Sequence, residues 1–249
     1  MRASSRIEKK HKRFKRLVSL ILIISILTIL LVFLLNSNYF NIDKITIKGN
    51  EKITKEKLLH TSSINFGENI FRISTRQAEE SIRKLPYVKT VKIRRELPRT
   101  ISIGVVEREE KVLLKDISMY YILDEEGYLL GNTDSNNDNL PVILGLKTER
   151  IDPGDNLFAN MEVKELEDLI KESEYLNLLK EIEAIEIENQ KNVNILINNG
   201  INVAFGPLSN VKYKVGLLSE IFNHSKENEI EIREIIMNRG EHPIIVTDN

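Results

Sequence analysis

The longest apolar run in the chain lies near its start. Residues 17–35 read LVSLILIISILTILLVFLL and contain no ionisable side chain. A helix of this length extends about 28 Å at 1.5 Å per residue, which is close to the thickness of the hydrocarbon core of a bilayer. The pattern predicts a transmembrane helix. The alternative is a cleaved signal peptide, whose apolar region is shorter and ends at a small-x-small cleavage site, and residues 34–38 (LLNSN) are a poor site.

The next region, residues 42–108, has the order strand, helix, helix, strand, strand. Residues 42–48 alternate apolar and polar side chains, which is typical of a half-buried strand. Thr54 is a candidate N-cap for the first of two short helices. Two further alternating runs, 87–95 and 101–105, predict a pair of strands that follow the helices.

The region from residue 109 to residue 237 alternates strand and helix patterns. The expected elements are a hairpin over 120–130, a short strand at 141–143, a helix over 161–180, strands near 182–188, 193–197 and 201–205, a helix over 211–222, and a last strand at 230–237. Asn199-Gly200 between two alternating runs is a strong hairpin signal. The pattern indicates a mixed α/β domain with an antiparallel-rich sheet.

Charge divides the chain at the apolar run. The 249 residues carry a formal net charge of -1, but residues 1–16 hold eight Lys or Arg and one Glu, so the remainder is acidic. The positive-inside rule places the basic block in the cytoplasm and everything after the apolar run outside. Binding of nucleic acid or of a cytoplasmic partner is an alternative use of this block, and we favour attraction to anionic lipid.

These patterns predict an α+β protein with a single transmembrane helix. The expected parts are a cytoplasmic basic tail (1–16), the transmembrane helix (17–35), a juxtamembrane linker (36–41), a βααββ domain (42–108), a mixed α/β domain (109–237) and a flexible C-terminal tail (238–249).

Several blocks of the sequence resemble a known family. The stretches ITIKGNEKITKEKLL, GENIFRIS and IRKLPYVKTVKIRRELPRTISIGVVERE resemble the POTRA domain of the FtsQ/DivIB cell division proteins. The stretches YYILDEEGYLL, LPVILGL, INNGINVAFGPLSNVKYKVGLLSEIF and IEIRE resemble successive blocks of the β domain of that family. The resemblance covers roughly residues 1–237, and it is more specific in the POTRA region than near the C-terminus.

The resemblance implies a protein of the division machinery. Its expected partners are two single-pass coiled-coil division proteins of the FtsL and FtsB/DivIC types, the membrane, and the septal peptidoglycan synthase complex. Its expected place is the cell membrane at the division septum, as a single-pass protein with a cytoplasmic N-terminus. The expected role is a scaffold that helps to assemble and regulate septal peptidoglycan synthesis.

In that family a partner strand adds to the edge of the last strand of the β domain. An exposed strand edge offers unpaired N–H and C=O groups, so it is a template for another backbone. We therefore expect Ile236→Lys or Ile235→Pro to weaken partner binding without unfolding the domain. The alternative is an ordinary edge strand that charge protects. The implied partner-binding residues are Ile230, Ile232, Arg233, Glu234, Ile235, Ile236 and Met237.

Three arginines, Arg94, Arg95 and Arg99, cluster beside the last hairpin of the POTRA region. They could form a docking surface for an acidic partner or for lipid headgroups. The alternative is a solvated strand face followed by a turn.

No pattern in the sequence indicates catalysis. The chain has no cysteine, its four histidines are scattered, and the carboxylates of residues 124–126 are contiguous in a turn, where side chains diverge. We therefore predict a binding protein that is not an enzyme and uses no cofactor, no metal and no nucleic acid. The alternatives are a POTRA-bearing receptor or chaperone of a protein secretion system, and a membrane-tethered cell-wall hydrolase.

Overall fold

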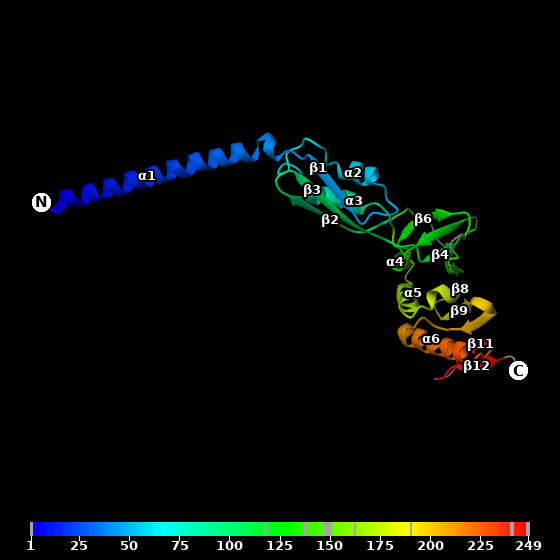
Figure 1. Ribbon diagram of the computed structural model, residues 1–249. Helices are drawn as coiled ribbons and strands as arrows, with labels where there is room; N and C mark the ends of the chain where they lie inside the picture. The colour runs from blue at the N-terminus through cyan, green and yellow to red at the C-terminus, as the bar shows by residue number, and fades with distance from the viewer. Residues whose placement is uncertain are drawn as a thin grey trace. The chain divides into compact units, whose positions relative to one another are not determined.

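The structure is a computed structural model that describes residues 2–117, 119–136, 139–146, 151–161, 163–189, 191–239 and 242–247, with side chains from Phe14 onward. The chain forms two compact units (Figure 1). Unit 1 comprises Met1–Ile82 and Thr90–Val106, and unit 2 comprises Arg83–Lys89 and Glu107–Asn249.

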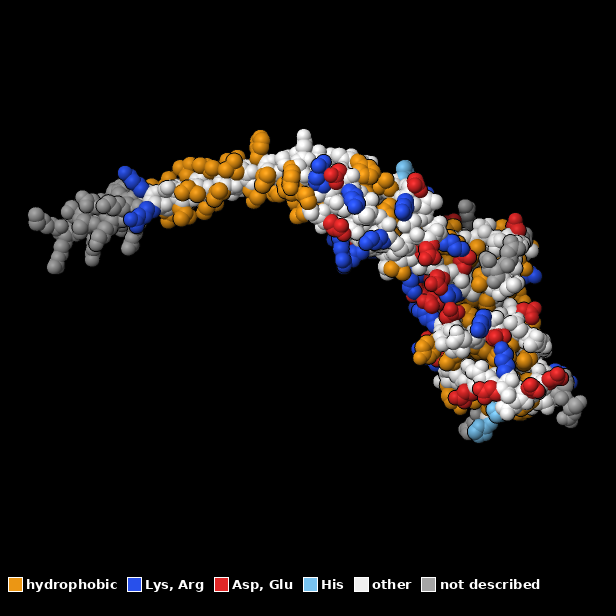
Figure 2. Space-filling view, in the orientation of Figure 1, with side chains coloured by type: hydrophobic (Ala, Val, Ile, Leu, Met, Phe, Trp, Pro, Cys, Tyr) orange, Lys and Arg blue, Asp and Glu red, His pale blue; other side chains and the backbone are white. Residues whose placement is uncertain are grey.

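Unit 1 begins with a long helix, α1 (Arg2–Leu35). Its segment Phe14–Leu35 is apolar enough and long enough to cross a membrane, and apolar side chains cover it in Figure 2. The predicted transmembrane segment is thus helical, and the helix also includes most of the basic block, for which no structure was predicted.

The rest of unit 1 follows the predicted order. Its elements are η1 (Asn38–Phe40), β1 (Lys44–Lys48), α2 (Lys55–Ser62), α3 (Thr75–Arg83), β2 (Val88–Glu96) and β3 (Thr100–Glu107). The last residue of α3, the start of β2 and the last residue of β3 belong to unit 2. The strand order is β1-β3-β2, and β1 runs parallel to β3 with Lys44 opposite Thr100. Thr54 caps α2 as expected, since its hydroxyl accepts a hydrogen bond from the amide of Lys57 at 3.2 Å.

Unit 2 is built on one large sheet. Its strands are β4 (Val112–Lys115), β5 (Tyr120–Leu123), β6 (Leu129–Thr133), β7 (Val142–Leu144), β8 (Ile182–Asn189), β9 (Asn192–Ile197), β10 (Ile201–Ala204), β11 (Ile232–Ile236) and β12 (Ile244–Thr247). Within the described residues the strand order is β12-β11-β10-β9-β8-β7-β4-β5-β6. Pairs β4–β7, β7–β8 and β10–β11 are parallel, and the remaining pairs that are described are antiparallel.

Helices α4 (Leu157–Asn160), α5 (Glu165–Tyr175) and α6 (Val211–Glu227), with the short turns η2 (Leu179–Glu181) and η3 (Asn198–Gly200), complete unit 2. The buried faces of α5 and α6 share one hydrophobic core with strands β8 to β11. The predicted hairpin at Asn199-Gly200 is confirmed, and both residues have positive φ, 67° and 78°.

Several elements of unit 2 differ from those expected from the sequence, and α4 is one that was not expected. The helix expected over 161–180 is shorter, because Asn177 takes a left-handed conformation (φ 57°) and ends it. Strand β4 was not predicted. Residues 244–247, which lie in the segment expected to be a flexible tail, form β12.

Candidate partner-binding surface

The predicted partner-binding strand lies inside the sheet. β11 pairs in parallel with β10 on one side, with Val203 opposite Ile235, and pairs in antiparallel with β12 on the other side, with Ile235 opposite Ile245. The expectation that the strand at 230–237 is a free edge is therefore wrong for this structure. The cause is the C-terminal segment, which turns back and occupies the position next to β11.

β12 has the features of a weakly held strand. It has four residues, and its side chains point largely to solvent, with Ile244 51% and Ile245 45% exposed. Ile235 of β11, which lies opposite Ile245, is fully buried in the core of unit 2. β12 therefore holds its place mainly through backbone pairing with β11, and it buries little apolar surface.

A register shift between Ile232 and Glu234 explains which side chains of β11 are buried. A bulge adds one residue to a strand and reverses the inward and outward alternation beyond it. Ile232 and Ile235 are both buried, whereas Ile236 is only partly buried, so the buried side chains of this strand do not alternate regularly. The expectation that Ile235→Pro leaves the domain folded is also wrong, because this residue is part of the core.

The other predicted residues surround this strand. Ile230 precedes β11 and is 41% exposed, Arg233 is exposed, Glu234 is partly buried, and Met237 donates its amide to the carbonyl of Ala204 at 2.9 Å. The structure thus brings the predicted set together at one end of the sheet, with Ile232 and Ile235 turned into the core.

An apolar groove of about 630 Å³ runs beside β11 and β12. Its wall on the helix side comes from Leu217 and Ile221 of α6, and its wall on the sheet side comes from Ile232 and Ile245. The sequence analysis did not identify these helix residues or β12 as part of the surface. The run Pro243-Ile-Ile-Val-Thr, rich in β-branched residues, is a strand signal that could have revealed β12.

The three arginines of unit 1 are not equivalent. The guanidinium of Arg95 donates to the carbonyls of Ile70 and Ile73, both at 2.8 Å, so it holds a loop of its own unit. The guanidinium of Arg99 donates to the carbonyl of Asn41 at 3.1 Å and pairs with Asp43 at 3.2 Å. Arg94 is exposed on β2. All three arginines are therefore exposed, and two of them, Arg95 and Arg99, also hold loops of unit 1.

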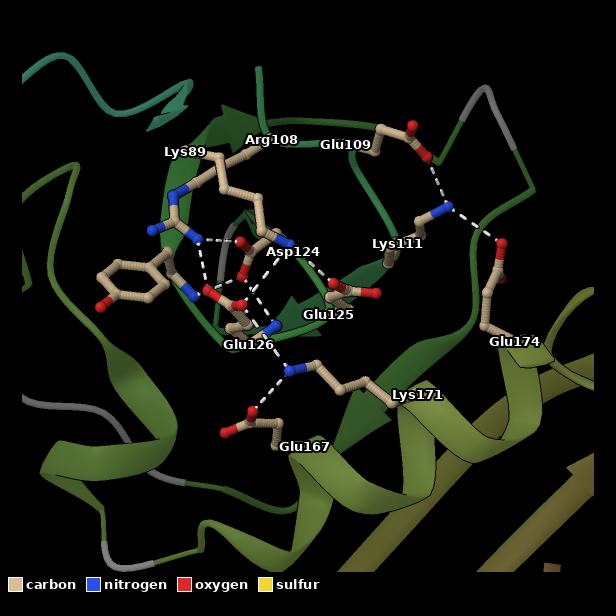
Figure 3. Close-up of polar contacts among 11 residues, drawn as sticks. Lys89, Arg108, Glu109, Lys111, Asp124, Glu125, Glu126, Glu167, Lys171 and Glu174 are labelled. Atoms are coloured by element: carbon tan, nitrogen blue, oxygen red, sulfur yellow. Dashed lines mark hydrogen bonds and ion pairs between the residues drawn. The ribbon is translucent and has the colours of Figure 1, made fainter. Parts of the chain in front are cut away.

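The carboxylates of the acidic turn of unit 2, residues 124–126, pair with basic side chains (Figure 3). Arg108 donates to the carboxylates of Asp124 and Glu126, and its guanidinium lies 3.6 Å from the centre of the Tyr128 ring. Lys89 donates to Glu125 at 2.8 Å. The other oxygen of Asp124 accepts the amides of Glu126 and Tyr128, so this carboxylate shapes the turn.

The pKa shifts in this cluster favour the ionised forms of its side chains. Burial alone would raise the pKa of Glu126, but the hydrogen bond from Arg108 and the charges of Lys89 and Lys171 outweigh it, and the pKa lies below the ordinary value. The pKa of Arg108 is raised, since its bonds to Glu126 and Asp124 outweigh the effect of burial. A carboxylate that stays ionised beside a permanent cation is a poor proton donor, so this arrangement suits a structural role.

No group of three or more His, Cys, Asp or Glu side chains in the described part of the chain is arranged to hold a metal ion. The surface at β11 and β12 combines strand backbone with a groove whose walls are largely apolar, although Glu220 and His224 also line it. Such a surface has the chemistry of protein binding by strand addition.

Comparison with known proteins identifies the family. A family model described as "POTRA domain, FtsQ-type" matches residues 40–108, and a model described as "Cell division protein FtsQ/DivIB, C-terminal" matches residues 112–236. The two regions correspond to the POTRA domain and the C-terminal domain of a cell division protein. The chain belongs to the FtsQ/DivIB family of cell division proteins.

Two relatives with similar sequences agree with this assignment. The chain is 27% identical over 197 residues to the cell division protein DivIB of Clostridium tetani, which covers 76% of this chain and 72% of the relative. It is 37% identical over 92 residues to DivIB of Clostridium acetobutylicum, which covers 37% of each chain. The solved extracytoplasmic domain of DivIB from Geobacillus stearothermophilus is similar over 49% of this chain and 97% of its own, with 19% identity and a TM-score of 0.31.

Proposed function

We propose that this chain is a single-pass division protein that binds FtsL-type and FtsB/DivIC-type proteins and helps to assemble and regulate septal peptidoglycan synthesis, without catalysis of its own. The membership of the family and the apolar helix α1 support this proposal. The basic block before α1 supports a cytoplasmic N-terminus, with units 1 and 2 outside the cell at the septum. Contact with the septal peptidoglycan synthase complex belongs to the same proposal.

The partner's strand enters at β11 by taking the place of β12. The observation that carries this step is the contrast between a buried β11 and a four-residue β12 with exposed side chains. An incoming strand forms the same backbone hydrogen bonds with β11 that β12 forms, and each contributes only about 0.5–1.5 kcal/mol net. The free energy of backbone hydrogen bonding therefore changes little when one strand replaces the other. Side chains of the partner that fill the groove beside α6 then favour the complex.

A disulfide lock between β11 and β12 tests this step. Glu234 lies directly opposite Val246, and the chain has no native cysteine, so Glu234→Cys with Val246→Cys forms one defined bridge. We expect the oxidised protein to lose co-purification with the FtsL-type and FtsB/DivIC-type partners, and the reduced protein to regain it.

The matched control is a lock at the other end of the same sheet. Tyr121→Cys with Asn132→Cys bridges β5 and β6, and partner binding should survive its oxidation. Normal binding by the oxidised β11–β12 lock would show that the partner does not replace β12. Depletion of the protein tests the wider role, since filaments with segregated nucleoids indicate a division defect, whereas intact septation with failed export would favour a secretion receptor.

A further inference from the structure

The folded part of unit 1 is joined directly to the end of α1. The side-chain amide of Asn69 donates to the carbonyl of Leu35 at 2.8 Å and to that of Ser37 at 3.4 Å. The guanidinium of Arg72 donates twice to the side-chain oxygen of Asn36, at 3.2 and 2.8 Å. These bonds bind the loop around Asn69 to the last turn of the apolar helix, so the loop lies at the level where the helix leaves the membrane.

Other loops are held at the same end of unit 1. The amide of Gly67 donates to the carbonyl of Ile42 at 2.8 Å, which places the neighbouring Phe66 beside the chain that leaves α1. The amide of Asp43 donates to the carbonyl of Arg99 at 3.1 Å, which places the turn between β2 and β3 at this end as well.

The exposed apolar side chains of unit 1 gather at this end. Outside α1, the large apolar side chains that are exposed among the described residues of unit 1 are Tyr39 (62%), Phe66 (58%), Phe71 (40%), Leu97 (59%) and Val106 (55%). The first four lie on the loops just described. Val106 lies near the far end of β3, about 20 Å away at 3.3 Å per residue.

Aromatic residues are favoured at the interface between hydrocarbon and water. Phe40 contacts both Tyr39 and Phe71 edge to face, each with 5.1 Å between ring centres, so these rings form a preformed surface. The charges at this end are mixed. Asp43 pairs with Arg99, and Glu68 and Glu96 lie on the same loops as the arginines. Apolar insertion therefore explains this surface better than attraction to anionic headgroups.

We propose that Tyr39, Phe66, Phe71 and Leu97 form a membrane-docking rim that inserts into the outer interface of the bilayer that α1 crosses. The rim and the bonds of Asn69 and Arg72 together give unit 1 a defined orientation on the membrane. A membrane helix alone would leave the folded part of unit 1 free to rotate about the end of α1. Several side chains inserted in the membrane interface restrict that rotation. This inference rests on the placement of α1 in a membrane under the proposed function, and it is independent of strand exchange at β11.

The absence of tryptophan from the chain permits a direct test. Full-length variants with a single tryptophan, Phe66→Trp or Leu97→Trp, are reconstituted into phosphatidylcholine vesicles with and without brominated acyl chains. Val106→Trp is the matched control, because Val106 is equally exposed and lies at the other end of β3. Resistance of the protein to alkaline extraction establishes separately that α1 is inserted.

In inserted protein we expect Phe66→Trp and Leu97→Trp to show blue-shifted emission and strong loss of intensity with brominated lipid, and Val106→Trp to show neither. Phosphatidylglycerol at one third of the lipid should leave the quenching nearly unchanged, because insertion is apolar. Unquenched emission from Phe66→Trp and Leu97→Trp in inserted protein would overturn the proposal and would leave a protein partner as the ligand of this rim. Equal quenching at Val106→Trp would overturn it too, since the whole unit would then lie on the lipid.

Discussion

The large sheet of unit 2 ends in two contrasting ways. Near β5 and β6, the turn is held by Arg108, Asp124 and Glu126, whose side chains are between 3% and 24% exposed. At the opposite end the sheet is closed by β12, in which Ile244 and Ile245 are about half exposed. One end is fixed by buried ion pairs and core packing, and the other is held mainly by the backbone.

This contrast indicates which end can change partners. Buried charges that lose a partner are strongly destabilising, so the end with Arg108 is unsuited to exchange. A strand that buries little apolar surface can leave without opening the core, and local opening occurs where such contacts are few. The core residues Ile232 and Ile235 belong to the core that α6 shares with the neighbouring strands, so β12 is not their only packing partner.

Removal of the central cation should have the largest effect on stability. Arg108→Met leaves Asp124 buried and unpaired, and we expect unit 2 to lose about 3–5 kcal/mol of unfolding free energy. Urea denaturation of the full-length protein in detergent, followed by circular dichroism, measures this loss. The control is Lys212→Met, whose partner Asp168 is exposed, and it should cost less than about 1 kcal/mol. Similar losses of unfolding free energy from both variants would show that the buried cluster stabilises the fold no more than an exposed ion pair does.

Truncation of paired side chains on β11 and β12 compares the two strands directly. Ile235→Ala removes a fully buried side chain and should cost about 2–5 kcal/mol. Ile245→Ala, at the position opposite, should cost less than about 1 kcal/mol, because Ile245 is 45% exposed. The same urea experiment measures both. An equal cost at the two positions would mean that β12 is packed as firmly as β11.

Acid should weaken the fixed end of the sheet, with a smaller effect. The pKa of Glu126 is lower in the folded protein than its ordinary value of 4.5. Its ionised form therefore stabilises the fold above about pH 4.5, and this stabilisation is lost as the pH falls through the lowered pKa. Urea midpoints between pH 7 and pH 3 should fall less steeply for Glu126→Gln than for the natural chain. Glu109→Gln, whose carboxylate is exposed, should change this slope less.

Much of the fold could be predicted from local patterns. Thr54 and the pair Asn199-Gly200 are local signals whose chemistry acts within a few residues, and the structure confirms both. The pattern of buried and exposed side chains in β11 could not be predicted, because the bulge between Ile232 and Glu234 depends on pairing with β12. The end of α5 was missed because Asn177 in a left-handed conformation leaves no trace in the apolar periodicity.

The sequence predicted a strand over the candidate site, but it did not predict that this strand is paired on both sides. The sequence located residues 230–237 at the end of the sheet, and the family resemblance supplied the idea of strand addition. Whether that strand is free depends on where residues 244–247 return, and a short apolar stretch near a terminus carries no information about its partner. The roles of Arg95 and Arg99 were hidden for the same reason, since their acceptors are carbonyls of distant loops.

Hydrogen exchange of the full-length protein, alone and with its FtsL-type and FtsB/DivIC-type partners, tests strand exchange most directly. In the protein alone, the amides of 244–247 should exchange much faster than those of 232–236. In the complex, the amides of 232–236 should stay protected while those of 244–247 exchange as fast as an unfolded segment. Slow exchange at 244–247 in the complex would contradict the replacement of β12 by a partner strand.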